Sequence, residues 1–349
     1  MNFSKKYLKQ EIKNLVNKIF PKTLLLYLME KNYTNLGFET SNACNANCSF
    51  CAYKFMKRKP KVISNELTYK VAKNYNDDGG GTINFTPVVG DPLVDKNLLN
   101  KIRECKNMKN INDIFLYTNG IYLDRFDLDD FCNSGLSRIS ISTYIGNRNG
   151  YKKYYGVDQY DRVIKNIKNL LKKNSDLGSP ISIFLHLRVD LPKESWEMNK
   201  DYLFIRKYID KGRINYLTNY DSWSGQISSN DIPKGCSLKI ENTKNSKDSR
   251  QPCFEMYRRI QVLSDGRVGV CVCRDVEAEI VIGDIKKNTV NEIWNGELLK
   301  KYRSNWKKGV LPDVCKSCNR YQPINKYINN NAYSIVITHL KRFKRKLSV

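Results

Sequence analysis

The chain has 349 residues, of which 60 are Lys or Arg and 35 are Asp or Glu, and its formal net charge is +25. This length allows one large domain and a smaller one. It contains no apolar run of 18 or more residues for a transmembrane helix and no recognisable secretory signal, so we expect a cytoplasmic protein. Eleven cysteines in such a chain indicate metal or redox chemistry rather than structural disulfides.

The large positive charge is compatible with a polyanionic partner, such as nucleic acid, an anionic lipid surface or a phosphorylated substrate. Lysine and asparagine are abundant along the whole chain, however, and no RNA- or DNA-binding motif accompanies them. Because a polyanion footprint clusters on one element, compositional bias and a solvated surface explain the charge better. We therefore do not expect nucleic acid as a partner.

The N-terminal segment from Ser4 to Phe20 has apolar residues at helical spacing among lysines, and Pro21 ends the pattern. A second apolar run, Leu24–Met29, follows. A basic amphipathic helix either makes a peripheral contact with a membrane or caps its own domain. We favour the cap. The apolar residues of the first pattern are Leu8, Ile12, Leu15, Val16 and Ile19.

From Tyr33 onward, strand and helix patterns alternate, which favours a parallel sheet with helical crossovers. The predicted strands are 34–40, 82–88, 113–119, 138–144, 181–191 and 214–220. The predicted helices are 66–75, 96–108, 123–132, 160–173 and 198–209. Periodicity alone does not distinguish an open sheet from a barrel.

Three cysteines, Cys44, Cys48 and Cys51, follow the first predicted strand with CxxxCxxC spacing. Three thiolates this close can hold three corners of a cubane iron–sulfur cluster and leave the fourth iron open to a small molecule. A zinc knuckle or unrelated thiols are the alternatives, because a motif needs its structural context.

A second cysteine set lies in the C-terminal part, around a predicted hairpin (260–263 and 268–272) and a helix opened by a capping box at Thr289 and Glu292. Four thiolates there would make a closed metal site, for which zinc and iron–sulfur are equally good from the sulfurs alone. These cysteines are Cys253, Cys271, Cys315 and Cys318, with Cys273 as an alternative ligand and Cys236 as a weaker one. Cys105 and Cys132 fall in predicted helices, where buried inert thiols are expected.

The CxxxCxxC loop, with Phe50 before its last cysteine, resembles the signature of the radical S-adenosylmethionine (radical SAM) enzymes. The resemblance implies a partial (β/α)6 barrel with its chemistry at the carboxyl ends of the strands. It also implies that S-adenosylmethionine (SAM) binds the open iron of a 4Fe–4S cluster. The segment Gly90-Asp91-Pro92 looks like the family segment whose backbone meets the methionyl amino group, although Asp91 replaces the commoner glutamate.

Later strand ends supply further candidates under the same resemblance. Thr118-Asn119-Gly120 matches a TNG turn common in the family, although an ordinary turn explains it equally well. Ser142 matches the position of a serine that contacts the cofactor ribose. His186 and Arg188 share one face of the fifth strand, where Arg188 could clamp an anionic substrate and His186 could move a proton. A hydrogen-bonded core role for His186 is the favoured alternative.

The second cysteine set and its surroundings look like the SPASM/twitch extension of radical SAM proteins, which binds auxiliary 4Fe–4S clusters. The matching segments are Pro252-Cys253, Asp265-Gly266, Ile282–Ile285, Glu292–Asn295 and the Cys315–Cys318 pair. No cysteine follows Cys318, so the resemblance implies one auxiliary cluster and two 4Fe–4S clusters in all. Asp275, just beyond Cys271, is the position at which we expect a catalytic base.

The composition shifts toward Ser, Asn, Asp and Lys near 224–250, where we place a domain boundary. The predicted parts are an N-terminal amphipathic helical segment (1–32), the barrel (33–228), a small α+β auxiliary-cluster domain (229–325) and a basic C-terminal tail (326–349). The basic patch Lys341–Lys346 in the tail is predicted to be a solvated terminus.

The resemblance implies reductive cleavage of SAM to a 5′-deoxyadenosyl radical, with a reductant protein such as flavodoxin or ferredoxin. We favour a two-electron oxidation of a small metabolite, such as a sugar or alcohol, because residues 1–33 are too few for a leader-peptide-binding domain. A peptide-modifying maturase with a separate leader-binding partner is the alternative. A non-enzymatic iron–sulfur or RNA-binding protein is a third interpretation, which the intact cysteine loop argues against.

Overall fold

The computed structural model describes residues 11, 15, 18–188, 190–236, 238–241 and 251–347. Within these residues, nine strands form one sheet in the order β11-β10-β9-β1-β2-β3-β4-β5-β6, and β7 pairs with β8. The barrel strands are β1 (Asn35–Phe38), β2 (Gly81–Asn84), β3 (Ile111–Thr118), β4 (Arg138–Tyr144), β5 (Ser182–Arg188) and β6 (Ile214–Leu217). The others are β7 (Asn219–Tyr220), β8 (Lys239–Ile240), β9 (Arg259–Val262), β10 (Arg267–Gly269) and β11 (Val281–Asp284).

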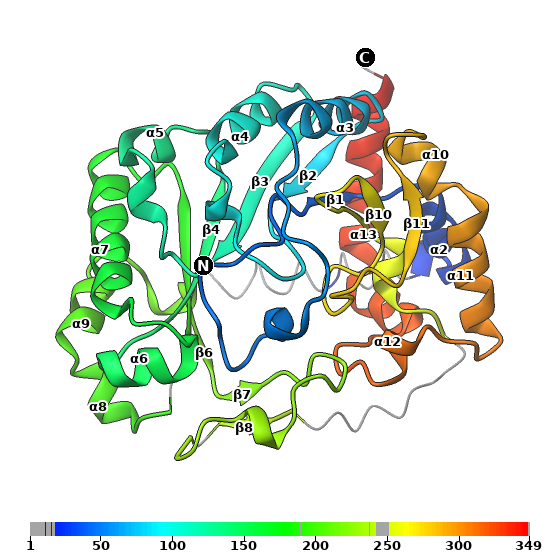
Figure 1. The fold of residues 1–349 in the computed structure, drawn as a ribbon. Helices are drawn as coiled ribbons and strands as arrows, with labels where there is room; N and C mark the ends of the chain where they lie inside the picture. Colours follow the sequence, from blue (N-terminus) through cyan, green and yellow to red (C-terminus); the bar gives the residue numbers. More distant parts are fainter. Residues whose placement is uncertain are drawn as a thin grey trace.

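Strands β1 to β6 run parallel. The helices between them lie on the outer side of the curved sheet, and the loop that follows β1 lies within its concave side (Figure 1). These helices are α3 (Asn65–Asp77), α4 (Leu98–Lys106), α5 (Leu128–Cys132), α6 (Arg148–Tyr155), α7 (Tyr160–Asp176), α8 (Lys193–Glu197) and α9 (Lys200–Arg206). The predicted α/β class, a partial barrel of parallel strands, is confirmed.

Helix α7 shows why this layering is stable. Its buried apolar residues recur at helical spacing, so one face packs inward while the lysines between them lie outward. The helix was predicted over 160–173 and continues to Asp176. Strand β4 spans the predicted residues 138–144, whereas helices α6 and α8 were not predicted.

The C-terminal module continues the barrel sheet. Strand β9 pairs with β1 in parallel, with Gly37 opposite Gln261, and the predicted hairpin brings β10 back antiparallel to β9. Strand β11 then pairs with β10. The module also contains α10 (Val290–Trp294), α11 (Glu297–Lys307) and α12 (Asp313–Lys316), and the predicted capping box opens α10. The two cysteine-bearing parts of the chain therefore share one hydrogen-bonded sheet.

The prediction of a solvated basic terminus holds for the exposed Lys341, Lys344 and Lys346 but is wrong for Arg342. Residues Ile324–Leu347 form helix α13, which packs beside α2 (Lys22–Lys31) and buries one face (Figure 1). Its Arg342 side chain is 3% exposed and donates to the Gly80 carbonyl and the Asp78 carboxylate, each at 2.6 Å. A basic residue thus holds the terminus against the start of β2 instead of facing water.

The helix predicted from Ser4 to Phe20 lies almost wholly outside the described residues, whereas the second apolar run forms α2. In the part of the chain that the structure describes, no helix combines the length and apolar character needed to cross a membrane.

Candidate functional site

The cysteine loop after β1 is docked on the carboxyl end of helix α6. The backbone N–H groups of Asn47 and Ser49 donate to the Tyr155 and Tyr154 carbonyls at 3.0 and 2.9 Å. Carbonyls in the last turn of a helix have no intrahelical partner, so these bonds satisfy the helix carbonyls as well as the N–H groups of the loop. The loop is thereby held within the concave side of the sheet by an element that the sequence did not predict.

The thiols of Cys44, Cys48 and Cys51 lie close enough to influence one another. Burial raises the pKa of Cys48 well above its ordinary value, the neighbouring Cys51 and Cys44 raise it further, and the Arg188 charge opposes the rise. Burial also raises the pKa of Cys44 and of Cys51. Three buried thiolates are costly unless a cation neutralises them, and metal binding supplies that compensation.

The segment Gly90-Asp91 is pinned to this loop. Gly90 has φ +116°, and a Cβ there would lie 2.5 Å from the Ser41 carbonyl oxygen, so the backbone approach requires glycine. The Asp91 N–H donates to the Ala43 carbonyl at 2.9 Å. The segment that we predicted to contact the cofactor through its backbone therefore lies against the cysteine loop.

The Asp91 side chain has a structural position. Its carboxylate accepts bonds from the Thr118 hydroxyl at 2.9 Å, the Asn119 N–H at 2.8 Å and the Leu93 N–H at 2.9 Å. Burial raises the Asp91 pKa to about 6, and these hydrogen bonds oppose the rise. The carboxylate links the ends of β2 and β3, which leaves the backbone of this segment as the part available to a cofactor.

The TNG turn is more than an ordinary turn. The Asn119 amide donates to the Asn45 side chain at 2.7 Å and to the Cys44 Sγ at 3.8 Å. Hydrogen bonds to a ligating sulfur tune a cluster, so Asn119 joins the site residues. The sequence contained the TNG motif, but it gave no reason to prefer a functional role for Asn119 over an ordinary turn.

The Arg188 guanidinium lies 3.4 Å from the centre of the Phe50 ring, and Phe50 itself is buried. The Nε of Arg188 is buried and has no hydrogen-bond partner among the described residues. A buried donor without a partner is costly, and a ligand that accepts from it removes the cost. Arg188, which we predicted as a substrate clamp, and Phe50 of the cysteine loop therefore lie in contact.

Ser142 and His186 face each other across the β4–β5 pair. The Ser142 hydroxyl bonds the Tyr155 hydroxyl at 3.1 Å, and Tyr155 in turn meets Phe50 edge-on. Burial, with a smaller effect of the Arg188 charge, lowers the pKa of His186, which keeps the imidazole neutral at pH 7. Its ring packs beside Tyr117, at 5.3 Å between centres. The neutral ring can accept a proton.

The second site gathers Cys253, Cys271, Cys315 and Cys318 around a cavity of about 30 Å³. Burial raises the pKa of Cys315, and the charges of the other three thiols of this set raise it further. Cys273 also lines the cavity, but its Sγ bonds the Glu255 carboxylate at 3.8 Å. The geometry thus favours Cys271 over Cys273 as the fourth ligand.

The same donor sets can be tested against a single metal ion. No three His, Cys, Asp or Glu side chains in the described ranges converge closely enough to ligate one ion. A tetrahedral zinc site needs that convergence, because Zn–S bonds are about 2.3 Å long. In a cubane cluster each sulfur binds a different iron, so the sulfurs lie further apart. The three thiolates of the first set and the four of the second can each occupy corners of such a cluster.

The remaining cysteines stand apart from these sets. Cys236 accepts a bond from the Tyr154 hydroxyl at 2.9 Å, on the barrel side. Cys105 and Cys132 are buried in α4 and α5, as predicted. Asp275 is buried, and its two carboxylate oxygens accept the Glu279 and Ile280 N–H groups at 2.7 and 2.8 Å. These bonds favour a structural role for Asp275 over the base that we expected.

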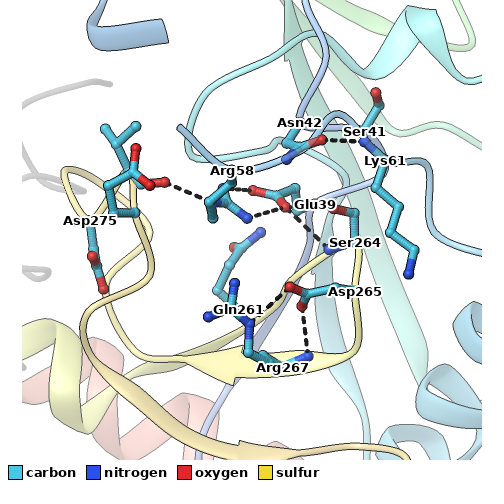
Figure 2. A network of polar contacts seen from close by, with 12 residues as sticks. Glu39, Ser41, Asn42, Arg58, Lys61, Gln261, Ser264, Asp265, Arg267 and Asp275 are labelled. Atoms are coloured by element: carbon cyan, nitrogen blue, oxygen red, sulfur yellow. Dashed lines mark hydrogen bonds and ion pairs between the residues drawn. The ribbon is translucent and has the colours of Figure 1, made fainter. Parts of the chain in front are cut away.

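A buried ion pair joins the two sites and was missed from the sequence (Figure 2). Glu39, just after β1, accepts two bonds from the Arg58 guanidinium at 2.9 and 2.7 Å, and neither side chain is more than 8% exposed. Glu39 also accepts from the Ser264 hydroxyl at 2.9 Å, and Arg58 Nε donates to the Val276 carbonyl at 2.8 Å. The pair thus fastens both flanks of the cysteine loop to the C-terminal module.

Comparisons with known proteins match the two cysteine sets separately. The model of the radical SAM superfamily matches residues 38–203, and that of SPASM, an iron–sulfur cluster-binding domain, matches 253–319. A probable GTP 3′,8-cyclase of Saccharolobus solfataricus is 26% identical over 297 residues, which cover 76% of this chain and 91% of the relative.

Two solved structures share the fold. BtrN in complex with AdoMet and 2-DOIA has a TM-score of 0.52 and 16% identity, covering 85% of this chain and 96% of BtrN. SuiB of Streptococcus suis bound to precursor peptide SuiA has a TM-score of 0.54 and 14% identity, covering 84% of this chain and 73% of SuiB. At these identities the likeness extends to the fold alone.

The position of Cys273 generates a test of the ligand set. Cys271→Ala is expected to lower iron after anaerobic reconstitution from about eight to about four atoms per chain, whereas Cys273→Ala leaves it unchanged. Iron and sulfide analysis measures the difference. The reverse pattern would assign the ligand to Cys273.

The Glu39–Arg58 pair generates a test of stability. Glu39→Gln leaves the Arg58 charge buried without a counter-ion, which costs about 3–5 kcal/mol. We expect a lower thermal midpoint and less iron at both cysteine sets. The control is Asp77→Asn in the exposed Lys73–Asp77 pair, where we expect little change because solvent screens both charges. Equal midpoints for the two variants would contradict the role given to Glu39.

Proposed function

Because the chain belongs to the radical SAM superfamily and carries a C-terminal SPASM iron–sulfur domain, we propose that it oxidises a small metabolite by two electrons. In this proposal Cys44, Cys48 and Cys51 hold the SAM-binding 4Fe–4S cluster. Cys253, Cys271, Cys315 and Cys318 hold one auxiliary 4Fe–4S cluster. A protein such as flavodoxin or ferredoxin supplies the electrons.

The cofactor, when bound, supplies the 5′-deoxyadenosyl radical that removes a hydrogen atom from the substrate. The chain's own residues hold it in place. The backbone of Gly90, Asp91 and Pro92 offers carbonyls to the methionyl ammonium, because this segment lies against the cysteine loop. Phe50 and Ser142 border the same space and contact the nucleoside in this proposal.

The observation that carries the proposal is the meeting of three thiols and the Arg188 guanidinium at the carboxyl ends of parallel strands. Its buried Nε lacks a partner among the described residues, and the charge faces the thiols. Arg188 can therefore bind a carboxylate or phosphate of a substrate that reacts beside the cluster. His186, neutral and on the same strand face, can accept the proton that an oxidation releases.

Relatives support a small substrate without deciding it. The names of two of them mention small molecules, GTP for the cyclase and 2-DOIA for BtrN. SuiB is bound to a precursor peptide, so a peptide-modifying maturase remains the alternative. An anionic metabolite fits better, because the Arg188 guanidinium carries a positive charge and a buried Nε donor that has no partner among the described residues.

The proposed chemistry has a direct test. The anaerobically reconstituted protein, given dithionite and SAM, is expected to form 5′-deoxyadenosine, detected by chromatography and mass spectrometry. Cys48→Ala abolishes the product, because the SAM-binding cluster loses a ligand. Cys132→Ala, which alters a buried thiol of helix α5, keeps it. An intact reconstituted protein that forms no 5′-deoxyadenosine would favour a binding protein instead.

The substrate class is tested by stimulation of the same assay. Phosphorylated or carboxylated sugars and alcohols are expected to accelerate 5′-deoxyadenosine formation, and their neutral counterparts to do so less. Arg188→Met removes a charge-assisted bond worth about 1.5–3 kcal/mol, so half-maximal concentrations of the anions rise about 10- to 100-fold. The rate of SAM cleavage without added substrate is the reference against which stimulation is measured. Stimulation by synthetic peptides alone would favour the maturase.

A further inference from the structure

One five-residue segment, 221–225, touches both cysteine-bearing loops. It follows β7 and is called the bridging segment below. Toward the first site, the Trp223 Nε1–H donates to the Phe50 carbonyl at 2.8 Å, one residue before Cys51. Trp223 and Cys51 also pack against the same small apolar cluster of Ala52, Val89 and Val276.

Toward the second site, the bridging segment contacts the pair Cys315–Cys318. The Ser317 hydroxyl, between these two cysteines, donates to the Ser224 carbonyl. A Cβ on Gly225 would meet the Ser317 side chain in ordinary contact at 3.5 Å. The segment therefore spans the distance between the two cysteine loops with its own backbone.

Arg274 completes the connection. Its guanidinium lies 4.5 Å from the centre of the Trp223 ring, and its Nε donates to the Asp221 carboxylate at 2.8 Å. Its backbone N–H donates to the Cys271 Sγ at 3.4 Å. The Arg274 charge also acts on the Cys51 thiol, where it opposes the effect of burial. One residue thus bonds a ligand of the second set and reaches a ligand of the first.

The backbone of the bridging segment is strained. Trp223 and Ser224 have φ of 47° and 57°, a left-handed region that non-glycine residues rarely occupy because it is sterically unfavourable. Bonds at both ends hold this conformation, among them the Trp223 N–H to the Asp221 carboxylate at 2.7 Å. Strain of this kind persists where the surroundings over-determine it and gathers at functional sites.

We propose that Trp223 and Arg274 form an electrostatic bridge between the two clusters, with Arg274 as a positioning residue that raises the reduction potential of both. This inference rests on the proposed function, since it presumes that both thiol sets hold clusters. Reduction adds one negative charge to a cluster, so a nearby cation stabilises the reduced form. The stacked Trp223 ring fixes where that cation lies.

The charges next to Arg274 make it possible to test the direction in which the reduction potentials shift. Asp221 also accepts a bond from Arg320 at 2.7 Å, and Arg320 pairs more loosely with the half-exposed Glu241 at 3.5 Å. Arg274→Gln removes a positive charge from this group, whereas Asp221→Asn removes a negative one. The two variants must therefore shift the potentials in opposite directions.

The experiment is a redox titration followed by electron paramagnetic resonance on the full chain. Cys315→Ala and Cys48→Ala serve as backgrounds, so that each cluster is measured alone. Arg274→Gln is expected to make both potentials more negative, and Asp221→Asn to make them less negative. Lys300→Gln, at an exposed position of α11, is the charge-matched control and leaves both potentials unchanged.

A second comparison isolates the role of the tryptophan. Trp223→Leu removes the ring that positions the guanidinium and the donor to the Phe50 carbonyl. In that background, Arg274→Gln is expected to shift the first cluster's potential less than it does in the otherwise unaltered chain. A merely structural effect would give the same shift in both backgrounds.

Several results would overturn the bridge. One is that both reduction potentials are unchanged in Arg274→Gln with its clusters loaded. Another is that Asp221→Asn shifts the potentials in the same direction as Arg274→Gln. If Arg274→Gln does not retain its clusters, Arg274→Lys replaces it, and a marked drop in both potentials despite the retained charge would contradict the proposal. Clusters absent from the unaltered chain would count against the proposed function instead.

Discussion

The position of the cysteine loop against the C-terminal module depends on a carboxylate that has no access to water. Glu39 leaves the end of β1, where the chain turns into the cysteine loop, and its charge is compensated by Arg58 on the far side of that loop. A buried ion pair contributes little net stability, but its geometry is exacting because either partner alone would be a buried charge. The same carboxylate accepts a bond from Ser264 of the C-terminal hairpin, so the loop is held against the module.

The sheet reinforces this dependence. Because β9 pairs with β1, the strand that leads into the first cysteine set and the hairpin that leads into the second are hydrogen-bonded neighbours. The distance between the two sets is therefore fixed by backbone pairing rather than by a flexible linker. The bridging segment crosses the same space from the other side, through Trp223 and Ser224. Two independent connections make the relative position of the two cysteine sets a property of the fold.

Local signals explain which parts could be predicted from the sequence. Cysteine spacing encodes ligand geometry directly, and strand β4 and helix α7 follow periodicity that needs no knowledge of distant partners. The burial of Arg342 in the C-terminal helix could not be predicted in this way, because its partner Asp78 lies 264 residues away in the sequence. Glu39 and Arg274 carry no motif of their own, and the TNG turn gave no reason to single out Asn119. Only the folded chain brings Asn119 and Arg274 to sulfur and Glu39 to Arg58. Asp275 was placed by adjacency to Cys271, whereas its bonds close a turn.

Two arginines near the first cysteine set, Arg274 and Arg188, have different roles. Arg274 is paired with Asp221 and stacked on Trp223, so its charge has a fixed position and its guanidinium is not free to take a ligand. Arg188 stacks on Phe50 and keeps a buried Nε without a partner in the described chain, so it pays a desolvation cost that a bound anion would relieve. The two cations act on Cys51 from different elements, the barrel strand and the C-terminal module. A substrate held by Arg188 would therefore react between a field set by the barrel and one set by the auxiliary domain.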